Sequence, residues 1–390
     1  MANNNENKIL NVPHLRFPEF SGEWKIVKVS ELLEFYSTNS LSWEQLDYGN
    51  GIIKNLHYGL IHKGLPTMVD ISSDLLPYIK SESMPKSYTL FLNGDVAFAD
   101  ASEDTNDVAK AVEIVNCDEQ QIVSGLHTIH GRDKSDLTVI GYKGYAFASD
   151  SFHKQIRRIA QGTKVFSINV RNFDEVRVGI PSKDEQIKIA KLLRAIDLRI
   201  ATQNKIIEKL QSLIKGLIVA LTTKGKPNIA ISQCLECHSS TLQESEVLPN
   251  GLYKVFGANG LIGYTNMAQM NGDAILIIKD GSGVGTVSYA QGRFSVIGTL
   301  NYLTSKGNHD LRYLYFALSA FNFQLYKTGM AIPHIYFKDY GKAKIYCPVL
   351  AEQKRVANVL GKLESKLFAE KKLRASFNLQ KQYLLEQMFI

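Results

Sequence analysis

Apolar residues recur at alternating spacings of four and three over residues 184–221. This heptad pattern predicts a long helix that packs against a second helix. One polar residue, Gln203, interrupts the pattern. Ser182 and Glu185 form a capping-box pattern at the predicted start, and Gly225 follows the predicted end. The predicted seam comprises Ile189, Leu193, Ile196, Ile200, Gln203, Ile207, Leu210, Ile214, Leu217 and Leu221.

A second long helix is predicted from Ala351 onward, with a less regular seam. Gln203 and Glu370 occupy equivalent positions of the two seams. If the helices run antiparallel about a pseudo-two-fold axis, we expect these two side chains to meet; the alternative is that both reach solvent. The second seam comprises Val356, Leu360, Leu363, Leu367, Phe377, Leu384 and Met388, and Glu370, Arg374 and Lys381 intrude on it.

The two helical segments belong to an internal repeat with a constant offset of 167 residues, which pairs Pro181 with Pro348 and Gln186 with Gln353. Two copies at so long a period do not form a solenoid. They indicate two similar halves, each a globular domain followed by a helix. The same offset also pairs Glu185 with Glu352, Ala190 with Ala357, Leu193 with Leu360, Gly162 with Gly329 and Ile168 with Ile335.

The segments between the helices carry short β-rich runs such as YTLFLNGDVAFA and AILIIKDG, punctuated by glycine and asparagine. Shorter helices fit residues 145–160 and 311–326. Each segment is therefore predicted to be a mixed α/β (α+β) domain with a curved sheet. The predicted order is an N-terminal arm (1–24), a first domain (25–182), a central helix (183–224), a second domain (225–350) and a C-terminal helix (351–390).

Composition adds little to this organisation. The chain has 390 residues, 45% of them hydrophobic and 21% charged, as in soluble globular proteins of two or three domains. No apolar run approaches the ~20 residues of a membrane span. The polar start, MANNNENKIL, lacks the apolar core of a signal peptide, so we expect a flexible arm, a cytoplasmic location and no membrane partner. The net charge of +7 permits a polyanionic partner without requiring one.

The sequence CLECH (234–238) matches the pattern of c-type haem attachment, but nothing indicates export, and no second pair of ligands is spaced for zinc. In the repeat, Cys234 and Cys237 replace Leu32 and Phe35. We therefore predict small core residues on one helical face, and no metal site. All four cysteines are expected to be free thiols in a reducing compartment.

The run KDGSGVG (279–285) resembles a phosphate-binding loop, but a β-like segment follows it instead of a helix. A tight turn at a sheet edge is the favoured interpretation, and a DNA-facing loop is the alternative. No methyltransferase motif of the N-P-P-Y or D-P-P-Y kind and no nuclease motif occurs. The scattered histidines are expected to be surface or core residues, so no catalytic residue is predicted; they are His57, His62, His127, His130 and His153.

Several of these segments resemble the specificity subunits of type I restriction–modification enzymes. The resemblance rests on LRFPEFSGEWKIVKVSELLEF, on the repeated proline–Glu-Gln–heptad segment, and on YKVFGANGLIGYTN and TGMAIPHIYFKDYGKAKIYCP. It covers nearly the whole chain. It implies two target-recognition domains, each recognising one half of a split, asymmetric DNA site, separated by a pair of long antiparallel coiled-coil helices.

The resemblance also implies partners: double-stranded DNA, two adenine-N6 methyltransferase (modification) subunits, and restriction/translocase subunits. This chain would be a non-catalytic specificity subunit that binds no cofactor, with S-adenosylmethionine, ATP and Mg²⁺ on the partner subunits. Two other classes stay open, a coiled-coil scaffold with two protein-binding heads and a remnant of a fused restriction–methylation enzyme. The missing methyltransferase motif argues against the remnant.

Candidate DNA contacts are polar and basic residues in the turn-rich stretches of each domain, because Arg, Lys, Asn and Gln can contact base edges while Ser, Thr and Lys hold phosphates. An ordinary solvated loop is the alternative for each of them. In the first domain they are Lys54, Asn55, His57, Tyr58, His62, Lys63, Ser102, Thr105 and Asn106. In the second they are Asn259, Tyr264, Asn266, Lys279, Asp280 and Ser282.

Overall fold

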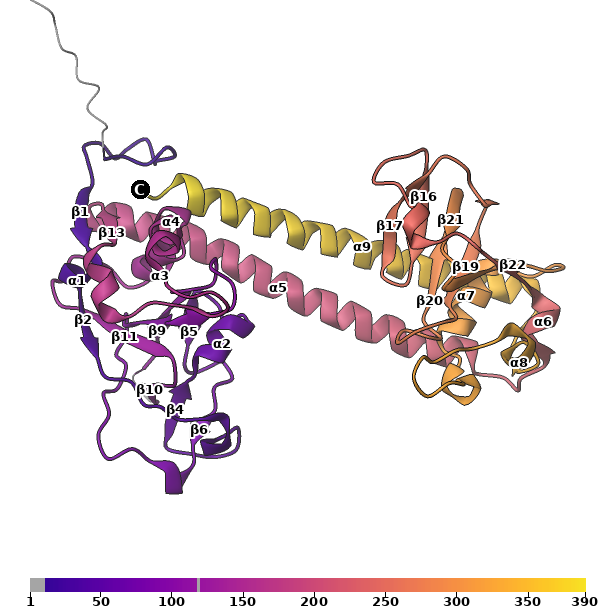
Figure 1. Ribbon diagram of the computed structural model, residues 1–390, viewed down its shortest axis with the longest axis horizontal. Coiled ribbons are helices and arrows are strands. Elements are labelled where there is room, and N and C mark those ends of the chain that lie inside the picture. Colours follow the sequence, from indigo (N-terminus) through magenta and orange to yellow (C-terminus); the bar gives the residue numbers. More distant parts are fainter. Residues whose placement is uncertain (1–10, 118–119) are drawn as a thin grey trace, which may run out of the picture. The chain divides into compact units, whose positions relative to one another are not determined.

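The computed structural model describes residues 11–117 and 120–390. These fold into two compact units (Figure 1). Unit 1 extends to Gln203 and includes Arg374–Ile390, and unit 2 comprises Asn204–Leu373. Two long helices, α5 (Lys183–Thr222) and α9 (Leu350–Gln387), each contribute one end to each unit. Within the described ranges, no helix is both long and apolar enough to cross a bilayer.

Unit 1 contains two main sheets where the sequence predicts one. The central strand β7 (Val96–Ala99) is buried on both faces, because Phe98 faces the core shared with the helices while Ala97 and Ala99 face a second core. One sheet has the order β2 (Leu33–Tyr36), β11 (Thr128–Asp133), β7, β9 (Ala111–Val115), β5 (Met68–Asp70). The other has the order β10 (Gln121–Ser124), β4 (Ile53–Leu56), β6 (Tyr78–Ile79), β3 (Leu46–Asp47).

Unit 2 is built in the same way. Strand β19 (Ala274–Ile278) is fully buried, because Ile275 and Ile277 enter the core beneath the helices while Leu276 enters a separate core. One sheet has the order β15 (Leu235–Ser239), β22 (Leu300–Ser305), β19, β20 (Val287–Ala290). The other has the order β17 (Gly260–Thr265), β16 (Tyr253–Gly257), β21 (Arg293–Val296), β18 (Met270–Asn271).

The short helices differ in detail from the sequence prediction. The single helix predicted at residues 145–160 is replaced by two, α3 (Tyr142–Phe147), which begins before it, and α4 (Asp150–Ile159). They are separate because the Ser149 hydroxyl caps α4 by accepting a hydrogen bond from the Phe152 amide at 3.3 Å. Residues 311–326 likewise divide into α7 (Leu311–Ser319) and a short 3-10 turn, Phe323–Tyr326. The remaining short helices are α1 (Val29–Leu32), α2 (Tyr58–Lys63), α6 (Ile231–Cys234) and α8 (Phe337–Tyr340).

The internal repeat is confirmed by equivalent backbone pairing. Strands β1 (Lys25–Lys28) and β13 (Arg177–Ile180) pair antiparallel in unit 1, as β14 (Ile229–Ala230) and β23 (Lys344–Ile345) do in unit 2. Each unit also has a loop closed by two backbone hydrogen bonds. The loop joins residues 161 and 167 in unit 1 and residues 328 and 334 in unit 2. These pairs are separated by the offset found in the sequence.

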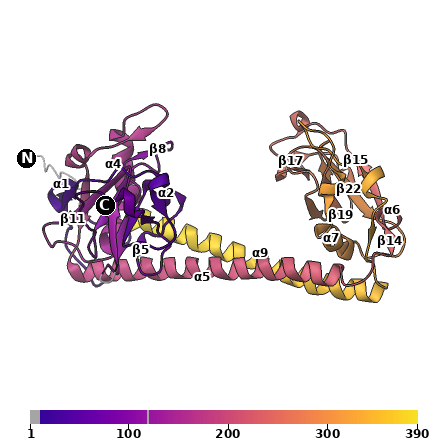
Figure 2. The same cartoon turned by 90° about the horizontal axis from the view of Figure 1, so that it is seen from below.

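The two long helices run antiparallel, as the contacts within each unit show (Figures 1 and 2). In unit 1, Ile189 near the start of α5 shares a core with Leu384 near the end of α9. In unit 2, Leu217 near the end of α5 packs against the core that contains Leu360 of α9. All ten predicted seam positions of α5 are buried or partly buried, and Gln203 is among the buried ones.

The polar residues of the second seam have partners. Lys381 pairs with Asp197 of α5 at 2.6 Å, and the Tyr145 hydroxyl donates to the same carboxylate at 2.9 Å. Glu370 pairs with Lys366 at 2.8 Å on its own helix. These contacts explain how charged side chains are tolerated in the seam. That Gln203 and Glu370 meet stays a prediction.

A buried glutamine joins each domain to the helix that follows it. The Gln186 side chain donates to the Pro181 carbonyl at 2.9 Å and accepts from the Val139 amide at 2.9 Å. Gln353 does the same with the Pro348 carbonyl at 2.7 Å and the Asp310 amide at 2.9 Å. Both glutamines thus satisfy buried backbone groups where a domain meets its helix, which explains the repeated Glu-Gln motif.

Residues 11–24 of the predicted N-terminal arm (1–24) are held against unit 1. The Arg16 guanidinium binds the buried Glu185 carboxylate with two hydrogen bonds of 2.8 Å, and the Trp24 side chain is buried in the core of unit 1. A bidentate pair and a buried indole fix this segment on the start of α5. The rest of the predicted arm, residues 1–10, lies outside the described residues.

Candidate nucleic-acid interface

Three candidate DNA contacts of the first domain lie in its interior. Lys54, Asn55 and His57 are 6%, 0% and 2% exposed. All four residues of β4 are buried, so polar residues that resemble a turn in the sequence belong to an interior strand. Lys54 Nζ donates to the Ile71 carbonyl at 2.7 Å. We therefore withdraw these three residues as DNA contacts.

His57 instead organises helix α2. Burial lowers the pKa of His57 to about 4, so its ring is neutral at pH 7 and can accept a hydrogen bond. Its Nδ1 accepts one from the Gly59 amide at 3.1 Å, which caps the helix. The ring also lies against Trp43, with the centroids 4.3 Å apart. His57 thus positions α2 without reaching the surface.

The neighbouring candidates gather on one surface, which we call the α2 surface and define as Trp43, Tyr58, His62, Lys63 and His127. Lys63 is exposed, and its Nζ lies 5.4 Å from the centre of the Trp43 ring. The Tyr58 ring meets His62 and His127 edge-on, with centroid separations of 5.7 Å and 5.1 Å. An exposed cation beside aromatic rings suits a nucleic-acid contact. The sequence prediction missed Trp43, because it lies in a different segment.

The second candidate stretch of this domain lies beside the α2 surface. His62 Nε2 donates to the Ala101 carbonyl at 2.9 Å, which brings α2 next to Ser102. Ser102 is partly buried and accepts from the Asp104 amide at 3.1 Å. Thr105 is partly buried in the same turn. The structure therefore brings together two stretches that are about forty residues apart in the sequence.

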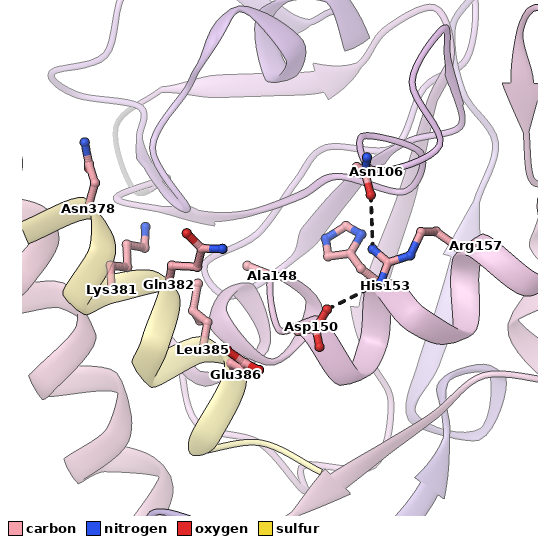
Figure 3. Close-up of a pocket in the computed structure, with 10 residues that line it drawn as sticks. All are labelled: Asn106, Ala148, Asp150, His153, Arg157, Asn378, Lys381, Gln382, Leu385 and Glu386. Atoms are coloured by element: carbon pink, nitrogen blue, oxygen red, sulfur yellow. Dashed lines mark hydrogen bonds and ion pairs between the residues drawn. The ribbon is translucent and has the colours of Figure 1, made fainter. Parts of the chain in front are cut away.

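Asn106 borders a polar hollow of about 450 Å³ between α4 and the end of α9 (Figure 3). Arg157 donates to Asn106 at 3.3 Å and to Asp150 at 3.3 Å. The other cation of the hollow, Lys381, is paired with Asp197. Because both cations have carboxylate partners, the hollow does not favour capture of an anion.

The candidates on the first hairpin of the second domain are not brought together. Asn259 lies exposed at the turn between β16 and β17, whereas Asn266 lies exposed beyond the far end of β17. Tyr264 is partly buried on β17, where it pairs with Lys254. These residues can meet DNA only as separate points of contact.

The glycine-rich run 279–285 forms a turn that packs against the 328–334 loop. The Asp280 carboxylate accepts a hydrogen bond from His334 at 2.7 Å and is also paired with Lys279. Burial acts to raise the pKa of Asp280, but these two partners outweigh it and hold the pKa below its usual value. Because Asp280 neutralises Lys279, the turn does not suit a phosphate.

The 328–334 loop carries exposed side chains that sequence reasoning did not select. Met330 and Ile332 are exposed at its tip, and Gly329 has a φ of 86°, which favours glycine. Ser282 is exposed in the adjoining turn. The sequence feature that could have identified this loop is the Thr-Gly…Pro-His run, which lies between two aromatic-rich segments.

The structure separates the two cysteines of CLECH. Cys234 ends the four-residue helix α6 and is buried, whereas Cys237 lies in strand β15 opposite Leu303. The prediction that both occupy one helical face is wrong, because the chain becomes extended at Leu235. His130, by contrast, is a buried core residue, as expected, and donates to Asp95 at 2.7 Å.

Comparison with known proteins places these features in a family. The family model of the type I restriction modification DNA specificity domain matches residues 21–212 and 235–376. The S subunit of a type I restriction–modification system from M. genitalium matches with a TM-score of 0.64 at 17% identity, over 97% of this chain and 99% of that one.

A chain from a structural study of the assembly and conformational transition of a type I restriction–modification system matches with a TM-score of 0.56 at 14% identity, over 96% of this chain and 98% of that one. A search of curated proteins found no match. The structural matches share the fold, and the family model matches both halves of the sequence. The chain therefore belongs to the family of type I restriction–modification DNA specificity subunits.

Proposed function

We propose that each domain of this specificity subunit recognises one half of a split, asymmetric DNA site. The observation that carries the proposal is a pair of equivalent loops with different side chains. The 161–167 and 328–334 loops have the same closing hydrogen bonds. Phe166 and Ser167 in the first correspond to Pro333 and His334 in the second. Two loops with the same backbone closure and different side chains are suited to recognise two half-sites of different sequence.

We infer that exposed apolar side chains of the long helices, in each unit by itself, bind protein partners. Large apolar side chains are exposed outside the seam positions, although a two-helix pair alone would favour polar residues there. We assign this surface to adenine-N6 methyltransferase subunits, two per complex, with restriction/translocase subunits completing a cytoplasmic assembly. S-adenosylmethionine, ATP and Mg²⁺ belong to those partners. The six most exposed of these residues are Leu198, Leu213, Val219, Phe368, Leu379 and Tyr383.

The test is reconstitution. The purified chain alone is expected to leave DNA unmethylated, and a cognate adenine methyltransferase subunit alone is expected to methylate no specific sequence. Together they should methylate one bipartite motif, detected by methylation-sensitive sequencing. Robust methylation by this chain alone would contradict a non-catalytic role. Specific DNA binding without any response to the methyltransferase would contradict the docking assignment.

The α2 surface gives a second expected result. Replacing Lys63 with alanine should make the dependence of log DNA affinity on log salt shallower by about one unit, because one phosphate contact and its released counterions are lost. The same change at Lys279 should have a smaller effect, because Asp280 already neutralises that cation. Fluorescence anisotropy across a salt series measures both slopes.

The matched control is Lys362→Ala, at an exposed position on α9. Its salt slope should equal that of the unmodified chain. If Lys63→Ala leaves the slope at the value of this control, the α2 surface does not face the DNA backbone.

A further inference from the structure

Three side chains with metal-ligating atoms meet in the interior of the second domain. They are Cys234, His309 and Cys347, and their ligand atoms all lie within 4.8 Å of one another. Cys347 Sγ is 3.7 Å from His309 Nδ1. The two cysteines are buried and the histidine is partly exposed, so solvent can reach the cluster from the histidine side. Nothing in the proposed function accounts for this grouping.

The separation between Cys347 Sγ and His309 Nδ1 matches that of two ligand atoms in a tetrahedral metal centre, and no other separation in the cluster exceeds 4.8 Å. Zinc binds thiolate sulfur at about 2.3 Å and imidazole nitrogen at about 2.0–2.1 Å, which places neighbouring ligand atoms about 3.5–3.8 Å apart. The 3.7 Å between Cys347 Sγ and His309 Nδ1 is already such a distance, so neither side chain has to move. Two sulfurs and one imidazole also form a donor set that zinc prefers over the harder cations.

The backbone at each ligand is held in place. Cys234 closes α6, and its carbonyl accepts a hydrogen bond from the Lys306 amide at 2.7 Å. The Asn228 side chain bonds both the amide and the carbonyl of Cys347, at 2.9 Å and 2.8 Å. The residue after His309 is bound by the buried Gln353. The three ligands are thus positioned by contacts that do not involve a metal, as in a preformed site.

We propose that Cys234, His309 and Cys347 bind one zinc ion, with water in the fourth position. Binding forms two Zn–S bonds and one Zn–N bond, and the two thiols release their protons to solvent. The ion would link α6, the loop before α7 and the segment that enters α9. The bound ion would fix the base of the second domain where the chain passes into the long helix.

This cluster could not be predicted from the sequence. Cys234 and Cys237 have the spacing that suggests a shared metal, yet Cys237 lies on the next strand and is not a member of the cluster. The true neighbours of Cys234 are separated from it by 75 and 113 positions along the chain. Such a site is visible only in three dimensions. The proposal departs from the expectation, drawn from the sequence, that this chain carries no metal centre.

The experiment titrates the reduced, metal-free full-length chain with Zn²⁺ and, separately, with Co²⁺ as a spectroscopic probe. We expect one equivalent of metal per chain, a thiolate-to-cobalt charge-transfer band with the visible absorption of tetrahedral cobalt, and a higher thermal unfolding midpoint with Zn²⁺. Cys347→Ser and His309→Ala should each lose the bound equivalent and the shift in midpoint. His309→Ala keeps both buried thiols, so it tests the ligand while leaving the core intact.

Cys237→Ser is the matched control, since it removes a neighbouring thiol and should retain the metal and its spectrum. Two outcomes would overturn the proposal. One is the absence of cobalt–thiolate absorption and of any Zn²⁺ stabilisation in the reduced chain. The other is the loss of two thiols as a Cys234–Cys347 disulfide in protein purified without reductant, with no metal bound after reduction.

Discussion

Replacing residues 25–180 with the corresponding domain of another specificity subunit is expected to change one half of the methylated DNA motif and leave the other half unchanged. Base edges are recognised by local side chains, and a wrong base pair costs about 1–3 kcal/mol, so several substituted contacts exclude the original half-site. The exchanged segment ends before Pro181 and Gln186, which preserves the hydrogen bond from that glutamine to the Pro181 carbonyl. Methylation-sensitive genome sequencing of cells with the matching methyltransferase measures the outcome.

The reciprocal exchange of residues 225–347 is the control. It should alter the other half of the motif and retain the first. If either exchange altered both halves, the two domains would not act as independent recognition modules. A chimera that loses all methylation would first be examined by thermal unfolding. The unfolding curve of a misfolded chimera differs from that of a folded chimera with altered specificity.

The second prediction with a large expected effect concerns the stability of the folded chain. Asp95 is buried in unit 1, where it accepts hydrogen bonds from His130 at 2.7 Å and from two nitrogens of Arg132 at 2.7 Å and 2.9 Å. Asp95→Asn removes a buried charge from this group. We expect a loss of about 3 kcal/mol in the free energy of unfolding, because it leaves Arg132 without its anion. Urea denaturation at neutral pH measures the loss.

The pH dependence follows from the shifted titration of Asp95. Burial acts to raise its pKa, but the hydrogen bonds from His130 and Arg132 outweigh burial and hold the pKa below its usual value. A carboxyl with a lowered folded-state pKa stabilises the fold above its unfolded pKa of about 3.9, and this contribution disappears as the pH falls through the folded value. The difference between the unmodified chain and Asp95→Asn should therefore be full at neutral pH and shrink below about pH 4.

The exposed Asp174 supplies the control, since Asp174→Asn should leave the stability within about 0.5 kcal/mol of the unmodified chain. If the stability difference between the unmodified chain and Asp95→Asn stayed constant down to pH 2, the charge of Asp95 would not be the source of that difference.

The long helices and the repeat could be predicted from the sequence because both leave regular local patterns. The heptad spacing from Ile189 onward places one side chain after another on a single helical stripe, and the observed burial follows it. The repeated Pro…Gln pattern similarly marks an interaction made within a few residues, between Gln186 and the Pro181 carbonyl. Such short-range features need no knowledge of the tertiary fold.

The candidate interface was less predictable, because burial in a β domain depends on which strands become neighbours. Lys54 and Asn55 have the composition of a surface turn, yet β4 lies between β10 and β6 and is buried throughout. Conversely, His334 joins Asp280 only because two loops 54 positions apart lie side by side. No periodicity in the sequence records either arrangement.

The division of the chain has a consequence for its synthesis on the ribosome. Unit 2 is one continuous stretch, so all of its residues have been translated once Leu373 has been added. The core of unit 1 also contains Leu384, Met388 and Phe389, and the Phe389 ring lies 5.8 Å from that of Tyr142. The domain that is translated first can therefore complete its core only last. Until residues 374–390 are translated, its uncovered apolar surface is available to chaperones.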